Sequence, residues 1–182
     1  MTINRVYIFD IDDTLINTKA CVKMVDNKGV VRAVLSSQKY NTRYSTSDLL
    51  YNHLTPDYSE FNSLEILKNE PKRSVFNILE ELSAECPENV YIITAREAKA
   101  IIHEWLEGCG VAIPLENIYT NELSPLPLGK WKAEKMMEIV GKCPPAYKTY
   151  VRVWEDNEEC RTNMKLQETL DLNITIMDIG DE

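Results

Sequence analysis

Short β-rich runs alternate with helix-length amphipathic segments over most of this chain. The β-rich runs lie at residues 6–9, 90–93, 118–119, 149–154 and 174–177. The helix-like segments lie at residues 75–82, 98–106, 131–140 and 160–170. Such alternation predicts a parallel sheet with helices on its faces. We therefore expect an α/β fold of three layers, Rossmann-like, with a central parallel sheet of about five strands.

The segment from about residue 17 to residue 70 breaks this alternation. Two β-rich runs, 21–25 and 30–35, surround a turn-like stretch at 26–29 and predict a hairpin. Five aromatic residues then lie among polar ones: Tyr40, Tyr44, Tyr51, Tyr58 and Phe61. Two interpretations stay open, because the segment either covers the active site or is a surface elaboration packed on the sheet. The expected organisation is a single domain over residues 1–182 with a hairpin-containing insertion or small cap at about 17–70.

Composition limits the classes of function. The chain has 182 residues, no apolar stretch of membrane-spanning length and no signal-peptide pattern, so we expect a cytoplasmic protein without a membrane partner. Its five cysteines form no Cys-x-x-Cys pair, which supports neither a zinc site nor a disulfide framework. A net charge of -9 disfavours a broad nucleic-acid footprint and suits an enzyme that uses a divalent metal.

The first β-rich run ends in two carboxylates, Asp10 and Asp12. In an extended strand, residues two apart project to the same side, so both can face one small volume beyond the end of the strand. Like charges held that close need a cation or a shared proton. Mg²⁺ accepts oxygen ligands and leaves room for water and phosphate. The pattern predicts metal-assisted phosphoryl transfer, in which one Asp attacks phosphorus while its neighbour moves the proton.

Four elements in order resemble the haloacid dehalogenase (HAD) superfamily of phosphohydrolases. They are the Asp-x-Asp-x-Thr motif at 10–14, Thr94 at the end of run 90–93, a lysine near Trp131, and Glu155-Asp156 after run 149–154. The resemblance covers the sheet scaffold and leaves out the insertion. It implies a HAD-like fold and a Mg²⁺-dependent phosphomonoester hydrolase.

The resemblance also implies roles for the first motif. Asp10 is the nucleophile that forms an aspartyl-phosphate, which splits hydrolysis into two displacements. Asp12 protonates the leaving oxygen and then activates water. An aspartate at this second position favours phosphatase over dehalogenase chemistry. Asp13 and Thr14 support the loop.

Thr94, Ala95 and a lysine are the expected phosphate-binding groups. The Thr94 hydroxyl donates to a phosphate oxygen, and the lysine neutralises charge that develops during transfer. Three lysines compete for this role: Lys130, Lys132 and Lys135. We favour Lys132 because it follows an aromatic residue, as the lysine of the family often does. The alternative for Thr94 is a cap on the following helix.

By the same resemblance, the Mg²⁺ ligands are Asp10, Asp12 and Asp156. Glu155 has a supporting role, although the sequence leaves open which of Glu155 and Asp156 contacts the metal. The alternative for this pair is structural, with Asp156 or Asn157 as the N-cap of the next helix.

Arg96 resembles the arginine of the Ser-Gly-Arg element in the 3′-phosphatase domain of bacteriophage polynucleotide kinases, where it could grip phosphate bidentately. Those phosphatases have a further arginine where this chain has Cys21. The preferred substrate is therefore a small phosphorylated metabolite or nucleotide. Two alternatives stay open, a polynucleotide 3′-phosphatase that acts on DNA or RNA ends and a non-catalytic binding module. The sequence does not determine the oligomeric state.

Overall fold

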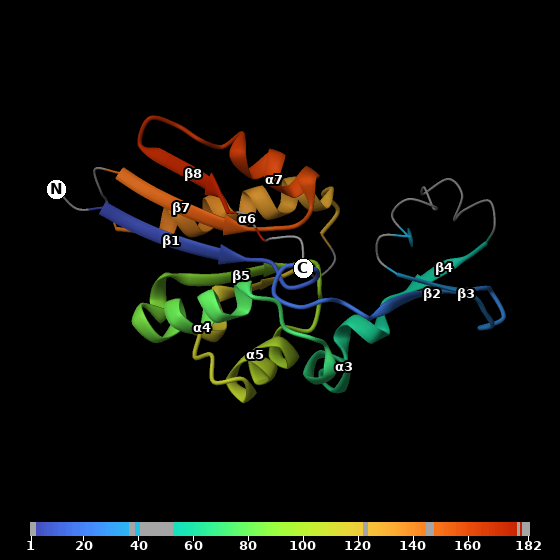
Figure 1. Cartoon of the computed structure of the whole chain (residues 1–182). Coiled ribbons are helices and arrows are strands. Elements are labelled where there is room, and N and C mark those ends of the chain that lie inside the picture. Colours follow the sequence, from blue (N-terminus) through green and yellow to red (C-terminus); the bar gives the residue numbers. More distant parts are fainter. Residues whose placement is uncertain are drawn as a thin grey trace. The chain divides into compact units, whose positions relative to one another are not determined.

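The computed structural model describes residues 3–36, 39–40, 53–121, 124–144, 148–177 and 179 (Figure 1). The chain divides into two compact units. The first unit comprises Met1–Asn17 and Pro71–Glu182, and the second comprises Thr18–Glu70.

A five-stranded parallel sheet forms the centre of the first unit, in the order β6-β5-β1-β7-β8. Its strands are β1 (Ile3–Phe9), β5 (Val90–Thr94), β6 (Ile118–Thr120), β7 (Lys148–Trp154) and β8 (Leu172–Ile176). All five coincide with the predicted β-rich runs within a few residues. The α/β class with a central parallel sheet is therefore confirmed.

Helices flank this sheet, with α4 and α5 on one side and α6 and α7 on the other (Figure 1). Their bounds are α4 (Val75–Glu85), α5 (Lys99–Gly108), α6 (Leu128–Lys142) and α7 (Glu158–Lys165), and short 3-10 helices are η2 (Pro87–Asn89) and η3 (Leu115–Asn117). One predicted helix end is wrong. The segment expected to reach residue 170 stops being helical after Lys165, and Leu170 is 93% exposed.

Alternate residues of the central strands form the main core. Val6 and Ile8 of β1 belong to one buried cluster with Trp131, Met136 and Ile139 of α6. On the α4 and α5 side, the rings of Phe76 and Trp105 meet at 5.6 Å between centroids. The central strands are thus buried on one side by a continuous apolar layer, as expected for a parallel sheet.

Gly129 lets α6 approach α7 closely. A Cβ at this position would lie 2.8 Å from Asn163 Nδ2 and 3.1 Å from the Glu159 carbonyl oxygen. Any side chain here would therefore push the two helices apart. Lys132 follows about one turn later on α6, so this approach helps to set where its side chain enters the core.

The second unit contains a three-stranded antiparallel sheet in the order β3-β2-β4. Its elements are β2 (Cys21–Val25), β3 (Val31–Ser36), β4 (Thr55–Asp57), the 3-10 helix η1 (Ser59–Asn62) and α3 (Leu64–Asn69). The predicted hairpin is confirmed by the β2–β3 pairing, and Gly29 in its turn has a φ of 77°.

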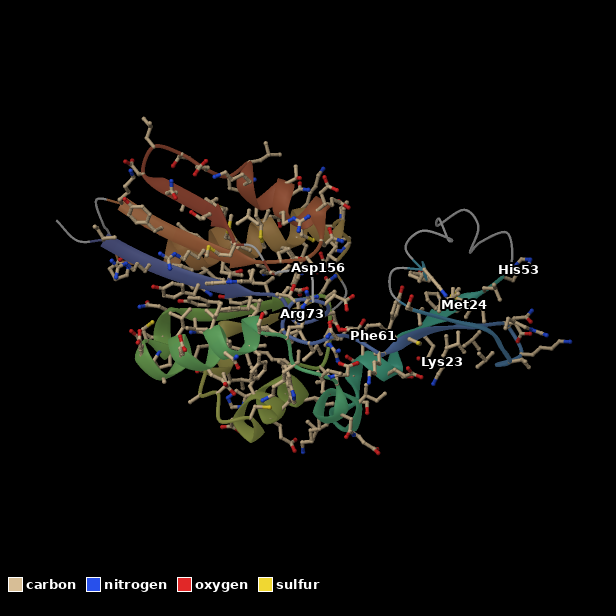
Figure 2. The ribbon with its side chains drawn as sticks, viewed as in Figure 1. Lys23, Met24, His53, Phe61, Arg73 and Asp156 are labelled. Atoms are coloured by element: carbon tan, nitrogen blue, oxygen red, sulfur yellow. The ribbon has the colours of Figure 1, made fainter. Side chains whose placement is uncertain are left out.

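A small core stabilises the second unit. Val22, Met24 and Leu35 are buried together, and Tyr40 and Phe61 pack against them (Figure 2). The Tyr58 ring contacts the rings of both Tyr40 and Phe61 edge-on. These aromatic side chains therefore contribute to the core of the second unit itself. Tyr44 and Tyr51 lie outside the described residues.

None of the helices in the described ranges combines the length and the apolar character that crossing a bilayer would require.

Candidate active site

Three carboxylates meet at the carboxyl ends of β1 and β7. These strands pair side by side, with Phe9 opposite Trp154, so the residues that follow them start from neighbouring positions. The Asp10 N–H donates to the Trp154 carbonyl oxygen at 3.0 Å. Asp10, Glu155 and Asp156 each offer an oxygen atom, and these atoms lie within 4.8 Å of one another. The group has the size of a site for one metal ion.

Lys132 reaches this group from α6. Its Nζ lies 2.8 Å from Asp10 Oδ1 and 2.7 Å from Glu155 Oε2, and the residue is 1% exposed. The two competing lysines differ, because Lys130 is exposed and Lys135 pairs with Glu138 near the surface. Of the three candidates, Lys132 is the one placed against the carboxylates.

Burial controls the electrostatics of the site. Burial, followed by the Glu155 charge, raises the pKa of Asp10 well above its ordinary value, although Lys132 opposes the shift. Burial and then Glu155 also raise the pKa of Asp156 to about 6. Burial alone would lower the pKa of Lys132, but the Asp10 and Glu155 charges outweigh it and raise that pKa above its usual range. Keeping Asp10 and Asp156 ionised in this site therefore lowers the free energy of unfolding.

The donor set fits a hard divalent cation. Three ionised carboxylates and one ammonium leave the group two negative charges in excess. An ion such as Mg²⁺ binds carboxylate oxygens and would balance that excess. Asp10 and Asp156 are the natural ligands. Both oxygens of Glu155 already accept hydrogen bonds, Oε2 from Lys132 and Oε1 from the Asn157 N–H, whereas Lys132 contacts Asp10 at Oδ1.

Asp12 and Arg96 pair with each other. Arg96 Nε donates to Asp12 Oδ2 at 3.0 Å, and Arg96 Nη2 donates to Asp12 Oδ1 at 2.7 Å. This fork-shaped contact has the bidentate geometry expected of a strong arginine–carboxylate pair. Asp12, predicted as a metal ligand, is not a member of the three-carboxylate group among the described residues. Arg96, predicted to grip phosphate, holds this carboxylate instead.

The loop after β1 is a tight turn and does not continue the strand. β1 ends at Phe9, and the Ile11 carbonyl oxygen accepts hydrogen bonds from the N–H groups of Thr14, Leu15 and Ile16. Asp13 has a φ of 57°, in the left-handed region that few residues other than glycine adopt. The placement of Asp12 therefore comes from this turn, whereas Asp10 is held by its N–H bond to β7.

Two further contacts fix that turn. Arg73 Nη1 donates to the Asp13 carbonyl oxygen at 2.8 Å, and the Asp156 N–H donates to Thr14 Oγ1 at 3.1 Å. Figure 2 labels Arg73 and Asp156 in the first unit. Thr14 is fully buried and thereby joins the loop after β1 to the loop after β7. Sequence reasoning did not single out Arg73, because no motif marks it.

The loop after β5 brings Thr94 to the same edge of the sheet. β5 pairs directly with β1, and Thr94 is its last residue. The Thr94 hydroxyl oxygen accepts a hydrogen bond from the Arg96 N–H at 3.2 Å. Helix α5 begins at Lys99 after Ala98, so the alternative role of Thr94 as a cap of this helix is wrong. Ala95, between Thr94 and Arg96, is exposed.

Asp156 and Asn157 were both candidates for the N-cap of the helix after β7, and only Asn157 has this role. Asn157 is the N-cap of α7, because its Oδ1 accepts a hydrogen bond from the Cys160 N–H at 3.1 Å. Asp156 is not the cap and keeps its carboxylate in the three-carboxylate group.

The raised pKa of Asp156 predicts how stability changes with pH. A carboxyl whose pKa is about 6 in the folded protein and 3.8 ordinarily stabilises the fold when protonated. This contribution is fully present below the ordinary value and is lost as the pH rises through about 6. In chelator, the melting temperature should therefore rise by about 2 °C or more as the pH falls from about 8 to 5, and added Mg²⁺ should stabilise most at the higher pH.

Thermal melts across this pH range, with Mg²⁺ and with chelator, measure both effects. Asp156→Asn is the control, because it lacks the titrating group and should show a weaker dependence on pH. Identical pH profiles for the wild type and Asp156→Asn would contradict the assignment.

Comparisons of the chain with protein-family models, curated proteins and solved structures found no significant match.

Proposed function

We propose that the chain is a Mg²⁺-dependent phosphomonoester hydrolase of the HAD type that acts on a small phosphorylated metabolite or nucleotide. The observation that carries the proposal is the convergence of Asp10, Asp156 and Lys132 at one edge of the sheet. These residues come from three of the motif positions on which the resemblance to the HAD superfamily rests.

The topology supports a ligand site at this place. The chain leaves β1 toward β5 and β6 on one side of the sheet and later returns to add β7 and β8 on the other. In open α/β sheets, ligands bind beyond the carboxyl ends of the strands where the order reverses. Here that point lies between β1 and β7, the two strands that Asp10 and Glu155 follow.

The proposed chemistry uses Asp10 as the nucleophile. A carboxylate oxygen of Asp10 forms a bond to phosphorus while the bond to the leaving oxygen breaks. Asp12, after it has taken up a proton and released one oxygen from Arg96, gives the leaving oxygen that proton. Water then attacks the phosphorus of the aspartyl-phosphate, and Asp12 accepts its proton. Inorganic phosphate and the free Asp10 carboxylate result.

The surrounding residues orient these groups. Arg96 fixes the Asp12 carboxylate through two hydrogen bonds, so its direction is set before substrate arrives. Lys132, 2.8 Å from Asp10, favours the ionised nucleophile and lies where it can neutralise phosphate charge. When bound by Asp10 and Asp156, Mg²⁺ would supply a Lewis acid that offsets the charge of the phosphate oxygens.

A phosphate-release screen tests the proposal. The panel contains nucleoside monophosphates, sugar phosphates and a 3′-phosphorylated oligonucleotide, each with Mg²⁺ and with chelator. We expect release from at least one small phosphomonoester that stops in chelator. Preference for the oligonucleotide would favour the 3′-phosphatase alternative.

A second measurement separates enzyme from binding module. Beryllium fluoride stands in for the phosphoryl group on an aspartate and should bind in the presence of Mg²⁺. Absence of both hydrolysis and beryllium fluoride binding would overturn the enzymatic proposal.

A further inference from the structure

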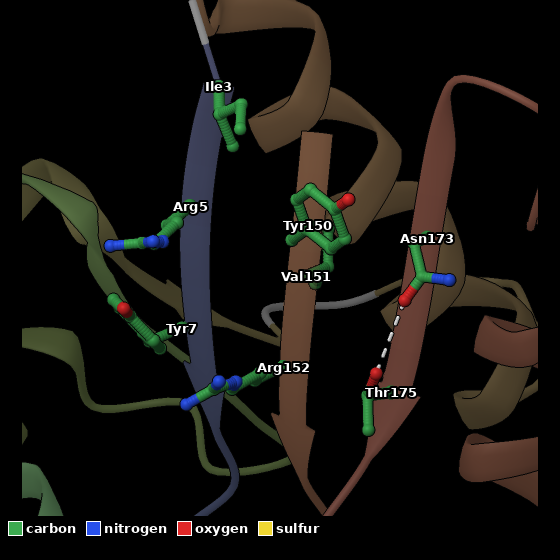
Figure 3. Close-up of a pocket in the computed structure, with 8 residues that line it drawn as sticks. All are labelled: Ile3, Arg5, Tyr7, Tyr150, Val151, Arg152, Asn173 and Thr175. Atoms are coloured by element: carbon green, nitrogen blue, oxygen red, sulfur yellow. Dashed lines mark hydrogen bonds between the residues drawn. The ribbon is translucent and has the colours of Figure 1, made fainter. Parts of the chain in front are cut away.

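A cavity of about 420 Å³ lies on the strands of the first unit, away from their carboxyl ends (Figure 3). Its eight lining residues all belong to three adjacent strands, β1, β7 and β8, and six of them share one face of the sheet: Arg5, Tyr7, Tyr150, Arg152, Asn173 and Thr175. They alternate with Val6, Val151 and Ile174, which are buried in the core under α6 and α7. The cavity therefore opens on the opposite face of the sheet, and its size falls in the range of small-molecule sites.

Two arginine side chains line this cavity. Figure 3 shows Arg5 and Arg152 reaching toward the same side of β1, with the Tyr7 ring between them. The parallel register places Arg5 beside Tyr150 and Tyr7 beside Arg152. Within the described part of the chain, neither arginine side chain has a hydrogen bond or ion pair with another protein group.

This local charge is opposite to that of the whole protein. In a chain with a net charge of -9, two arginines lie together with no carboxylate bound to either of them in the described ranges. Two guanidinium forks match the several oxygens of one phosphate group, which they bind bidentately. The charge complementarity therefore favours a phosphate-bearing ligand.

The other half of the cavity suits a planar ring. Tyr150 is 37% exposed and offers its ring for stacking, and Lys148 Nζ lies 5.7 Å from the ring centroid. The Thr175 hydroxyl donates to Asn173 Oδ1 at 3.3 Å, which fixes the amide of Asn173 at the edge of the cavity (Figure 3). An aromatic ring that is open to stacking is a common way to hold a nucleobase.

We propose that this cavity binds a nucleoside monophosphate, with the phosphate held by Arg5 and Arg152 over the Tyr7 ring and the base against Tyr150. The site shares no residue with the three-carboxylate group. It does not rest on the proposed phosphatase activity, because its lining residues are distinct from the groups that would perform hydrolysis.

Calorimetric titration with adenosine 5′-monophosphate tests the site. The titration uses Asp10→Asn in chelator, which prevents turnover and metal-dependent binding at the carboxylates. We expect saturable binding that weakens about tenfold or more when Arg5→Gln and Arg152→Gln are added together. Lys28→Gln with Lys130→Gln is the matched control, because it removes two exposed positive charges elsewhere and should leave the affinity unchanged.

Half-ligands test the two ends separately. Adenosine and ribose 5-phosphate should each bind more weakly than the complete nucleotide. Tyr150→Ser should weaken the nucleotide and adenosine while leaving ribose 5-phosphate unaffected, which gives a test that does not depend on the arginine variants. Absence of nucleotide binding, or an affinity unchanged by both the arginine pair and Tyr150→Ser, would overturn the proposal.

Discussion

Replacing Asp10 by Asn is expected to lower Mg²⁺-dependent phosphate release by about four orders of magnitude or more while the protein stays folded. The amide cannot form the acyl-phosphate bond, so the first displacement is lost. The change keeps the volume of a side chain that is 5% exposed, so packing should be preserved. Because burial raises the pKa of Asp10, its ionised form disfavours the fold at neutral pH. Removing the charge should therefore leave the melting temperature in chelator equal or higher.

Two measurements separate catalysis from folding in this experiment. Single-turnover phosphate release reports the first displacement, and a thermal melt in chelator reports stability. Asp171→Asn is the matched control, because Asp171 is exposed before β8 and lies outside the three-carboxylate group. Full turnover by purified Asp10→Asn would exclude Asp10 as the nucleophile.

Lys132→Met should cause the largest loss of stability. The ammonium group of Lys132 lies against Asp10 and Glu155 inside the protein, and methionine leaves both carboxylates buried without their cation. Breaking a buried ion pair on one side costs about 3–5 kcal/mol in the free energy of unfolding. Activity should also fall by roughly two to three orders of magnitude, since the charge beside the transferring phosphoryl group is lost.

Urea unfolding in chelator measures the loss in the free energy of unfolding. Repeating it at about pH 8 and pH 5 tests whether ionised carboxylates cause that loss. The deficit should shrink at the lower pH, because protonation relieves carboxylates whose folded-state pKa is raised. Lys135→Met is the control on the same helix. Its exposed pair with Glu138 should contribute less than about 1 kcal/mol. Equal losses for the two variants, unchanged by pH, would show that Lys132 does not compensate the buried carboxylates.

The sequence was sufficient for the scaffold because each strand is a short β-rich run between helix-length segments. Burial of the sheet under flanking helices favours such runs. The end of α7 was not predictable in the same way. Leu166 and Leu170 continue the apolar pattern, yet they are 74% and 93% exposed, so the pattern extends beyond the surface that the sheet can cover.

The sequence predicted which residues lie in the candidate site, but it did not predict which side chains pair with each other there. Arg96 and Asp12 are separated by 84 positions, and a guanidinium group can pair equally with a phosphate or a carboxylate. Only the tertiary arrangement decides between them. For Lys132 a usable signal was present, since Met136 and Ile139 follow at four and seven positions, the spacing of one buried helix face.

The middle position of β1 has a consequence for biosynthesis. A ribosome makes β1 well before β7, because the register of the two strands joins Ile3 to Lys148. A nascent chain that has not yet reached β7 exposes one edge of β1 and lacks both Glu155 and Asp156. Such an edge is open to mispairing with other chains. The ion site cannot assemble until β7 and the two residues after it have been made, so shorter translation products should be inert and should depend on chaperones for solubility.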